Sequence, residues 1–67
     1  MDNTVRKLAN EVSVGEIVEV GPGFWAEVTR ADANVACVDI GWSDARGQEG
    51  RMVCLLTDVV NCWQEAA

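Results

Sequence analysis

Short runs of alternating apolar and polar residues, separated by turn-forming residues, follow one another from Val14 to Gln64. Alternation with a period of two is typical of a β-strand that buries one face. We predict five strands, a helical turn at residues 57–60 and turns or loops between the strands. The five strands are expected at residues 14–20, 24–31, 35–42, 51–56 and 61–64. Strands of this length at such short spacing favour a single small barrel.

The alternation also assigns each side chain to one of two faces. The more apolar row of each strand is expected to face the interior, because burial of apolar surface stabilises the fold. The predicted core consists of Val14, Val18, Val20, Ala26, Val28, Ala36, Val38, Ile40 and Leu56. Four apolar residues then point outward, and we expect an interface between copies of the chain at Ile17, Trp25, Val53 and Leu55.

A different period marks residues 1–12. Apolar residues recur there at i, i+3, i+4 and i+7, as on one face of a helix, at Val5, Leu8, Ala9 and Val12. Asp2, Asn3 or Thr4 would cap such a helix. We predict a short N-terminal helix in residues 1–12, followed by a barrel domain at residues 13–67; a frayed tail is the alternative.

Two segments resemble the SH3-like small barrels. Residues 14–20, Val-Gly-Glu-Ile-Val-Glu-Val, resemble the hydrophobic-Gly-Asp-x-Val-x-Val opening of that group. Residues 56–60, Leu-Thr-Asp-Val-Val, are similar to its turn before the last strand. The resemblance implies a mainly all-β fold, a five-stranded SH3-like barrel over about residues 13–64.

Within that group, the order of a glycine-rich turn, an aromatic-Trp pair, a hairpin and a terminal turn is similar to the type II dihydrofolate reductases. Those proteins are tetramers that bind substrate in a central pore. Their pore motif, Val-Gln-Ile-Tyr, falls near residues 52–55, where this chain has neither the glutamine nor the tyrosine. The resemblance therefore implies no catalytic residue here, only a barrel able to self-associate.

The amino-acid composition favours self-association and excludes some classes of binding partner. A chain of 67 residues has a small interior, yet 49% of its residues are hydrophobic. The hydrophobic residues that do not fit in the interior must lie at the surface, so we expect a homo-oligomer, either a dimer or a tetramer. The net charge of −6, with only five basic residues, opposes binding to nucleic acid and to anionic membranes.

The remaining chemistry is sparse. No segment has the pattern of a signal peptide or a membrane span. The three cysteines, Cys37, Cys54 and Cys62, are an odd number and form no Cys-x-x-Cys pair. We expect them to be buried thiols in a cytoplasmic protein without metal or cofactor. The chain has no histidine to act as a general base, so no catalytic residue is expected.

The tryptophans are the best candidates for a binding site. Trp25, Trp42 and Trp63, edged by Asp39 and Asp44, could hold a cationic or amphipathic ligand through cation–π contact. Alternatively, the tryptophans fill the core and a subunit interface. The sequence thus predicts a non-catalytic, homo-oligomeric module that binds a peptide or small ligand. The alternative is a small oligomeric enzyme whose pocket forms only between subunits.

Overall fold

A computed structural model describes residues 4–64, which form one antiparallel sheet of six strands. The strands are β1 (Thr4–Leu8), β2 (Ile17–Gly21), β3 (Phe24–Ala33), β4 (Cys37–Ser43), β5 (Glu49–Leu55) and β6 (Val59–Trp63). A single 3-10 turn, η1 (Ala9–Glu11), follows β1. The strand order is β1-β6-β2-β3-β4-β5, so β1 and β5 are the two edges of an open sheet. The mainly all-β prediction is confirmed.

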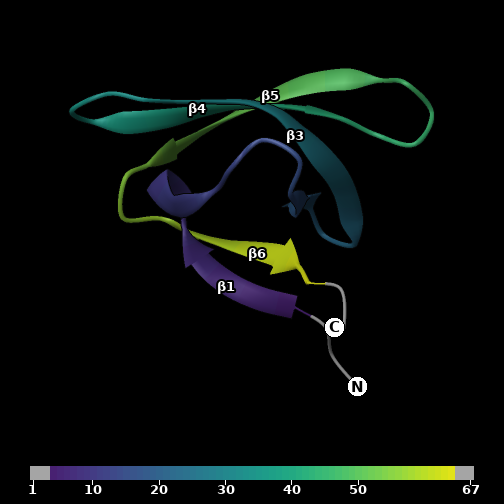
Figure 1. Cartoon of the computed structure of the whole chain (residues 1–67), viewed down its shortest axis with the longest axis horizontal. Coiled ribbons are helices and arrows are strands. Elements are labelled where there is room, and N and C mark those ends of the chain that lie inside the picture. Colours follow the sequence, from purple (N-terminus) through teal and green to yellow (C-terminus); the bar gives the residue numbers. More distant parts are fainter. Residues whose placement is uncertain (1–3, 65–67) are drawn as a thin grey trace.

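The sheet bends into two layers (Figure 1). Strands β3, β4 and β5 form one layer, and β1 and β6 lie across it in the other. The inward residues of both layers make one core, in which Val18, Val28 and Ile40 are fully buried and Val38 is 1% exposed. Because alternate residues face the same side of a strand, this core fixes which side chains point outward.

Most of the predicted core is confirmed, with two errors. Five of its members are buried: Val18, Ala26, Val28, Val38 and Ile40. Val20 and Leu56 are partly buried and pack against them.

The two errors lie just outside the strands. Val14 is 64% exposed, because Gly15 with a φ of 95° starts a turn that breaks the alternation before β2. Ala36 is exposed in the loop before β4, where its N–H donates a hydrogen bond to Asn34 Oδ1.

The predicted N-terminal helix is wrong. Residues 4–8 form β1, which pairs with β6 so that Val5 lies opposite Cys62 and Lys7 opposite Val60. Only Ala9–Glu11 is helical. Ala9 and Val12 reach the core from this turn, whereas Leu8 is 40% exposed. The proposed capping residues Asp2 and Asn3 lie outside the described residues.

The predicted helical turn at residues 57–60 is also wrong, and the sheet has six strands instead of five. A tight turn closes at Asp58, whose N–H donates to the Leu55 carbonyl at 3.0 Å. Val59 already begins β6, as suits two consecutive β-branched residues. Among residues 4–64 the structure contains no helix long and apolar enough to cross a membrane.

Candidate functional site

Two of the three tryptophans meet on the outer face of β6, β2 and β3. Ile17 lies opposite Trp63 in the β2–β6 pairing, and Trp25 lies opposite Glu19 in the β2–β3 pairing. The indole rings of Trp25 and Trp63 meet edge to face, with centroids 5.9 Å apart and planes at 76°. Trp63 is 46% exposed, and Ile17 and Trp25 are half-buried. We call Ile17, Trp25 and Trp63 the tryptophan face.

Two carboxylates flank the tryptophan face. Glu27 is exposed and lies opposite Ile17 in the β2–β3 pairing. Glu19 accepts hydrogen bonds from the Asn61 side-chain amide at 3.0 Å and from the Gly23 N–H at 2.9 Å. These two bonds, the Asn61 bond first, lower the pKa of Glu19 and keep it ionised. The arrangement therefore combines exposed aromatic rings with negative charge.

The third tryptophan lies elsewhere. Trp42 is on the inward row of β4, opposite Gly50 of β5, and meets Phe24 edge to face with centroids 5.4 Å apart. The structure therefore brings Trp25 and Trp63 together and leaves Trp42 in a separate aromatic pair.

Both aspartates of the predicted site already have partners within the fold. Asp44 Oδ1 accepts hydrogen bonds from the N–H groups of Arg46 and Gln48, which shapes the β4–β5 loop. Asp39 lies between two cations, 2.9 Å from Arg51 Nε and 3.5 Å from an Arg30 guanidinium nitrogen. Asp39 lies apart from the tryptophan face, whereas Asp44 borders it, because Asp44 lines a small pocket together with Ile17, Trp25 and Glu27.

The predicted interface residues divide between two outer faces. Ile17 and Trp25 lie on the tryptophan face. Val53 and Leu55 are 59% and 60% exposed on the outer row of β5, where Leu55 lies opposite Cys37. Cys54 and Cys62 are buried thiols, as predicted, whereas Cys37 is half-buried.

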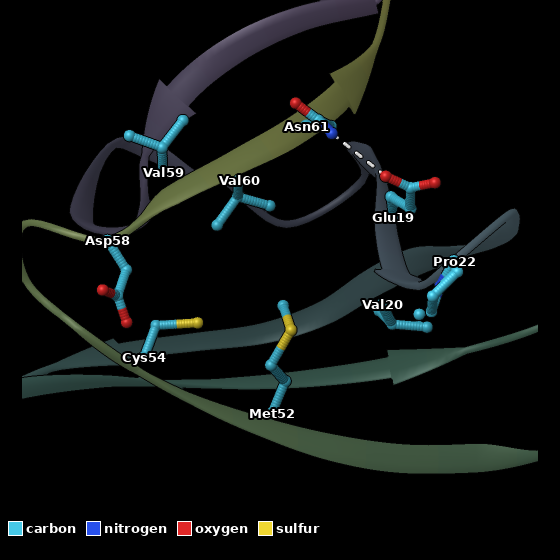
Figure 2. Close-up of a pocket in the computed structure, with 10 residues that line it drawn as sticks. Glu19, Val20, Pro22, Met52, Cys54, Asp58, Val59, Val60 and Asn61 are labelled. Carbon is cyan, nitrogen blue, oxygen red and sulfur yellow. Dashed lines mark hydrogen bonds between the residues drawn. The ribbon is translucent and has the colours of Figure 1, made fainter.

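A groove that the sequence did not reveal lies between the layers (Figure 2). Strands β2 and β6 pair only at Ile17–Trp63 and Val18–Cys62, and beyond these positions the Asn61–Glu19 hydrogen bond links them. The groove has a volume of about 560 Å³. Its apolar lining includes Val20, Met52, Cys54 and Val60, and its polar rim includes Glu19, Asp58 and Asn61.

The groove depends on strands that separate, which no local residue pattern encodes. In Figure 2 the side chains of Met52 and Cys54 project from β5 towards Val60 of β6. Burial, and to a lesser extent the charge of Asp58, raise the pKa of the Cys54 thiol. Since the thiolate is the nucleophilic form, Cys54 is poorly suited to covalent chemistry.

Other chemical signals in the described part of the chain are weak. Residues 4–64 contain no group of three or more His, Cys, Asp or Glu side chains placed to hold a metal ion. No family model matches the chain, and no curated protein or solved structure matches it either. The tryptophan face and the groove are therefore the two surfaces from which a function can be argued.

Proposed function

We propose that the protein is a non-catalytic, homo-oligomeric binding module that holds a cationic peptide on the tryptophan face. The observation that carries this proposal is the edge-to-face pair of Trp25 and Trp63 beside Glu19 and Glu27. A lysine or arginine side chain over an exposed indole gains about 0.5–1 kcal/mol from the cation–π interaction. Nearby carboxylates add charge attraction to the same cation.

The overall charge favours the same kind of partner. The chain carries eleven acidic and five basic residues, so a cationic peptide is attracted from a distance, more strongly at low salt. Apolar residues of the peptide would contact Ile17, which is half-buried between Trp63 and Glu27. In this proposal Trp42 and Asp39 stabilise the fold and do not contact the ligand, whereas Asp44 borders the tryptophan face beside Trp25 and Glu27.

A titration with a synthetic peptide tests the proposal. The probe is an acetylated, amidated peptide of alternating arginine and leucine, and its counterpart replaces each arginine with glutamate. We expect the tryptophan fluorescence to change and saturate with the arginine peptide only. Equal binding of the glutamate peptide, or no binding of the arginine peptide at millimolar concentration, would refute the proposal.

Variants then locate the site. Trp63→Ala and Glu27→Gln should each weaken binding of the arginine peptide several-fold. Glu49→Gln is the matched control for charge, because Glu49 begins β5 and lies outside the tryptophan face. If Glu49→Gln weakens binding as much as Glu27→Gln does, the attraction is a general effect of net charge and the site is wrong.

One observation favours the second candidate, an oligomeric enzyme with a pocket between subunits. The groove takes Met52 and Cys54 from the edge strand β5, next to the place where another subunit could pair. Met52 is the sole methionine within residues 4–64, so its labelled methyl group reports on the groove in NMR spectra. A small ligand that shifts the Met52 methyl signal and leaves the tryptophan signals unchanged would favour this candidate.

A further inference from the structure

We infer that the groove between the layers is a second binding site, which takes a linear aliphatic diamine with an ammonium group at each end. The inference goes beyond the peptide proposed for the tryptophan face, because it assigns a different ligand to a different surface. It requires neither a second subunit nor a catalytic step.

The groove carries negative charge at both ends and no positive charge between them. Among the ten residues that line it, Glu19 and Asp58 are acidic and none is basic. Neither carboxylate takes part in the ion pairs formed within residues 4–64. Figure 2 shows Asp58 and Glu19 on opposite sides of the apolar side chains of Met52 and Val60. A ligand that complements this pattern has an apolar middle and a cation at each end.

Both carboxylates retain room for a donor from the ligand. Each oxygen of a carboxylate can accept about two hydrogen bonds. Within residues 4–64, Asp58 uses Oδ2 for the Leu55 N–H, at 2.8 Å, and Oδ1 remains open. Glu19 accepts one hydrogen bond on each oxygen, from Asn61 on Oε1 and from Gly23 on Oε2. An ammonium group brings three N–H donors, so it can bind either carboxylate without breaking these bonds.

The separation of the carboxylates sets the length of the ligand. Asp58 precedes Asn61 by three residues of nearly extended chain, which span about 10 Å. Asn61 in turn donates the hydrogen bond that holds Glu19. A hexane chain with an ammonium group at each end is of comparable length. A much shorter diamine reaches only one carboxylate, as a monoamine does.

The lining between the carboxylates suits the methylene groups of such a chain. Val20 and Met52 are half-buried, and Val60 is 5% exposed, so they present apolar walls. Each methylene group that leaves water completely strengthens binding by about fourfold. The unbranched side chain of Met52 can also adjust to the shape of the ligand. The walls therefore favour a long aliphatic diamine over a short one.

A series of amines tests the inference. The probes are ethane-diamine, butane-diamine and hexane-diamine, with hexylamine and hexanediol for comparison. The methyl NMR signal of Met52 reports binding, because Met52 lies in the lining. We expect hexane-diamine to bind most tightly, hexylamine several-fold more weakly, and hexanediol most weakly of the three hexane compounds. Equal affinities of hexylamine and hexane-diamine, tighter binding of ethane-diamine, or no shift with hexane-diamine at millimolar concentration would each overturn the inference.

Charge variants locate the diamine. Asp58→Asn removes one carboxylate and keeps an acceptor oxygen for the Leu55 N–H, so it should weaken hexane-diamine about two- to fivefold. Glu49→Gln makes the same change of net charge at the start of β5, outside the groove, and should leave the affinity unchanged. Equal losses in the two variants would show that net charge alone attracts the diamine. If Asp58→Asn does not fold, Glu19→Gln, which keeps an oxygen for Asn61, provides the same comparison.

The two proposed ligands are distinguishable. Glu19 borders both surfaces, whereas Asp58 belongs to the groove and Glu27 to the tryptophan face. Asp58→Asn should weaken the diamine and spare the arginine peptide, and Glu27→Gln should do the reverse. A protein that binds the peptide and no diamine refutes this inference alone, and a protein that binds the diamine and no peptide refutes the proposed peptide alone. We expect the diamine to be recovered unchanged, and its conversion to another compound would overturn the binding site in favour of the oligomeric enzyme.

Discussion

The indole of Trp42 occupies the space that a side chain at position 50 would need. Gly50 lies opposite Trp42 in the β4–β5 pairing, and a Cβ atom at Gly50 would fall 2.5 Å from Cε2 and 2.7 Å from Cη2 of the ring. The ring can therefore lie over the strand and reach Phe24. Gly50 serves the close approach of an aromatic ring, a recurrent use of glycine within strands.

We predict that Gly50→Ala destabilises the protein by about 1–3 kcal/mol, because the indole must move to admit one methyl group. Urea unfolding measures the loss. Gly21→Ala is the matched control, since a Cβ there would sit at an ordinary 3.7 Å from the Phe24 Cβ. Equal losses in the two variants would show that the overlap with Trp42 is not the cause.

Val38→Ala tests the assignment of the inner row. Val38 is 1% exposed and belongs to the core, so loss of its two methyl groups should cost roughly 1–3 kcal/mol of unfolding free energy. Val35→Ala removes the same atoms from a residue that is 98% exposed, and it should change stability by less than about 0.5 kcal/mol. Denaturant unfolding of both variants measures the two losses of unfolding free energy. Similar losses would show that Val38 was wrongly assigned to the inner row.

The sequence predicted the inner rows of β2, β3 and β4 because local alternation and the final burial agree there. Val18, Val28 and Ile40 each lie within a strand whose two faces differ clearly in polarity. Prediction failed where the alternation was extended past the end of a strand, at Val14 and Ala36. The backbone turns at those positions, so parity no longer determines the direction of a side chain.

Tertiary pairing explains the larger errors. The helical spacing of Val5, Leu8, Ala9 and Val12 is real, but pairing of β1 with β6 decides the conformation of the first two. Isolated short helices are marginal, so a neighbouring strand can override a weak local preference. The three tryptophans predicted to form one site lie in two places for a similar reason. Whether Trp42 meets Trp63 or Phe24 depends on the order of the strands in the sheet, which a sequence pattern does not contain.

The turn between β5 and β6 depends on one side chain. Asp58 Oδ2 accepts a hydrogen bond from the Leu55 N–H at 2.8 Å, and the Asp58 N–H donates to the Leu55 carbonyl. Asp58→Ala removes the side-chain acceptor and should cost about 1 kcal/mol of unfolding free energy. Asp58→Asn retains an acceptor oxygen and should lose less unfolding free energy than Asp58→Ala. Denaturant unfolding compares the two variants, and equal losses would mean that this bond contributes little.

The ion pair of Lys7 and Glu16 should make stability depend on pH in acid. Lys7 Nζ lies 2.9 Å from Glu16 Oε2, and the Ser13 N–H donates to Oε1 at 2.9 Å. Burial alone would raise the pKa of Glu16, but the hydrogen bonds from Lys7 and Ser13 outweigh it and bring the pKa below its ordinary value of 4.5.

A carboxyl group whose pKa is lower in the folded state stabilises the fold above its unfolded pKa, and that contribution disappears as the pH falls through the folded pKa. Glu16→Gln cannot ionise, so the gap in unfolding free energy between wild type and variant should be largest at pH 7 and shrink towards pH 3. Urea unfolding at pH 7, 5 and 3 measures this gap. Lys7→Met removes the ammonium group, while burial still opposes the ionisation of Glu16. When Glu16→Gln is made in the Lys7→Met protein, its effect on the unfolding free energy should therefore depend less on pH, or in the opposite direction. A gap that is constant with pH would show that Glu16 ionises equally in the folded and unfolded chains.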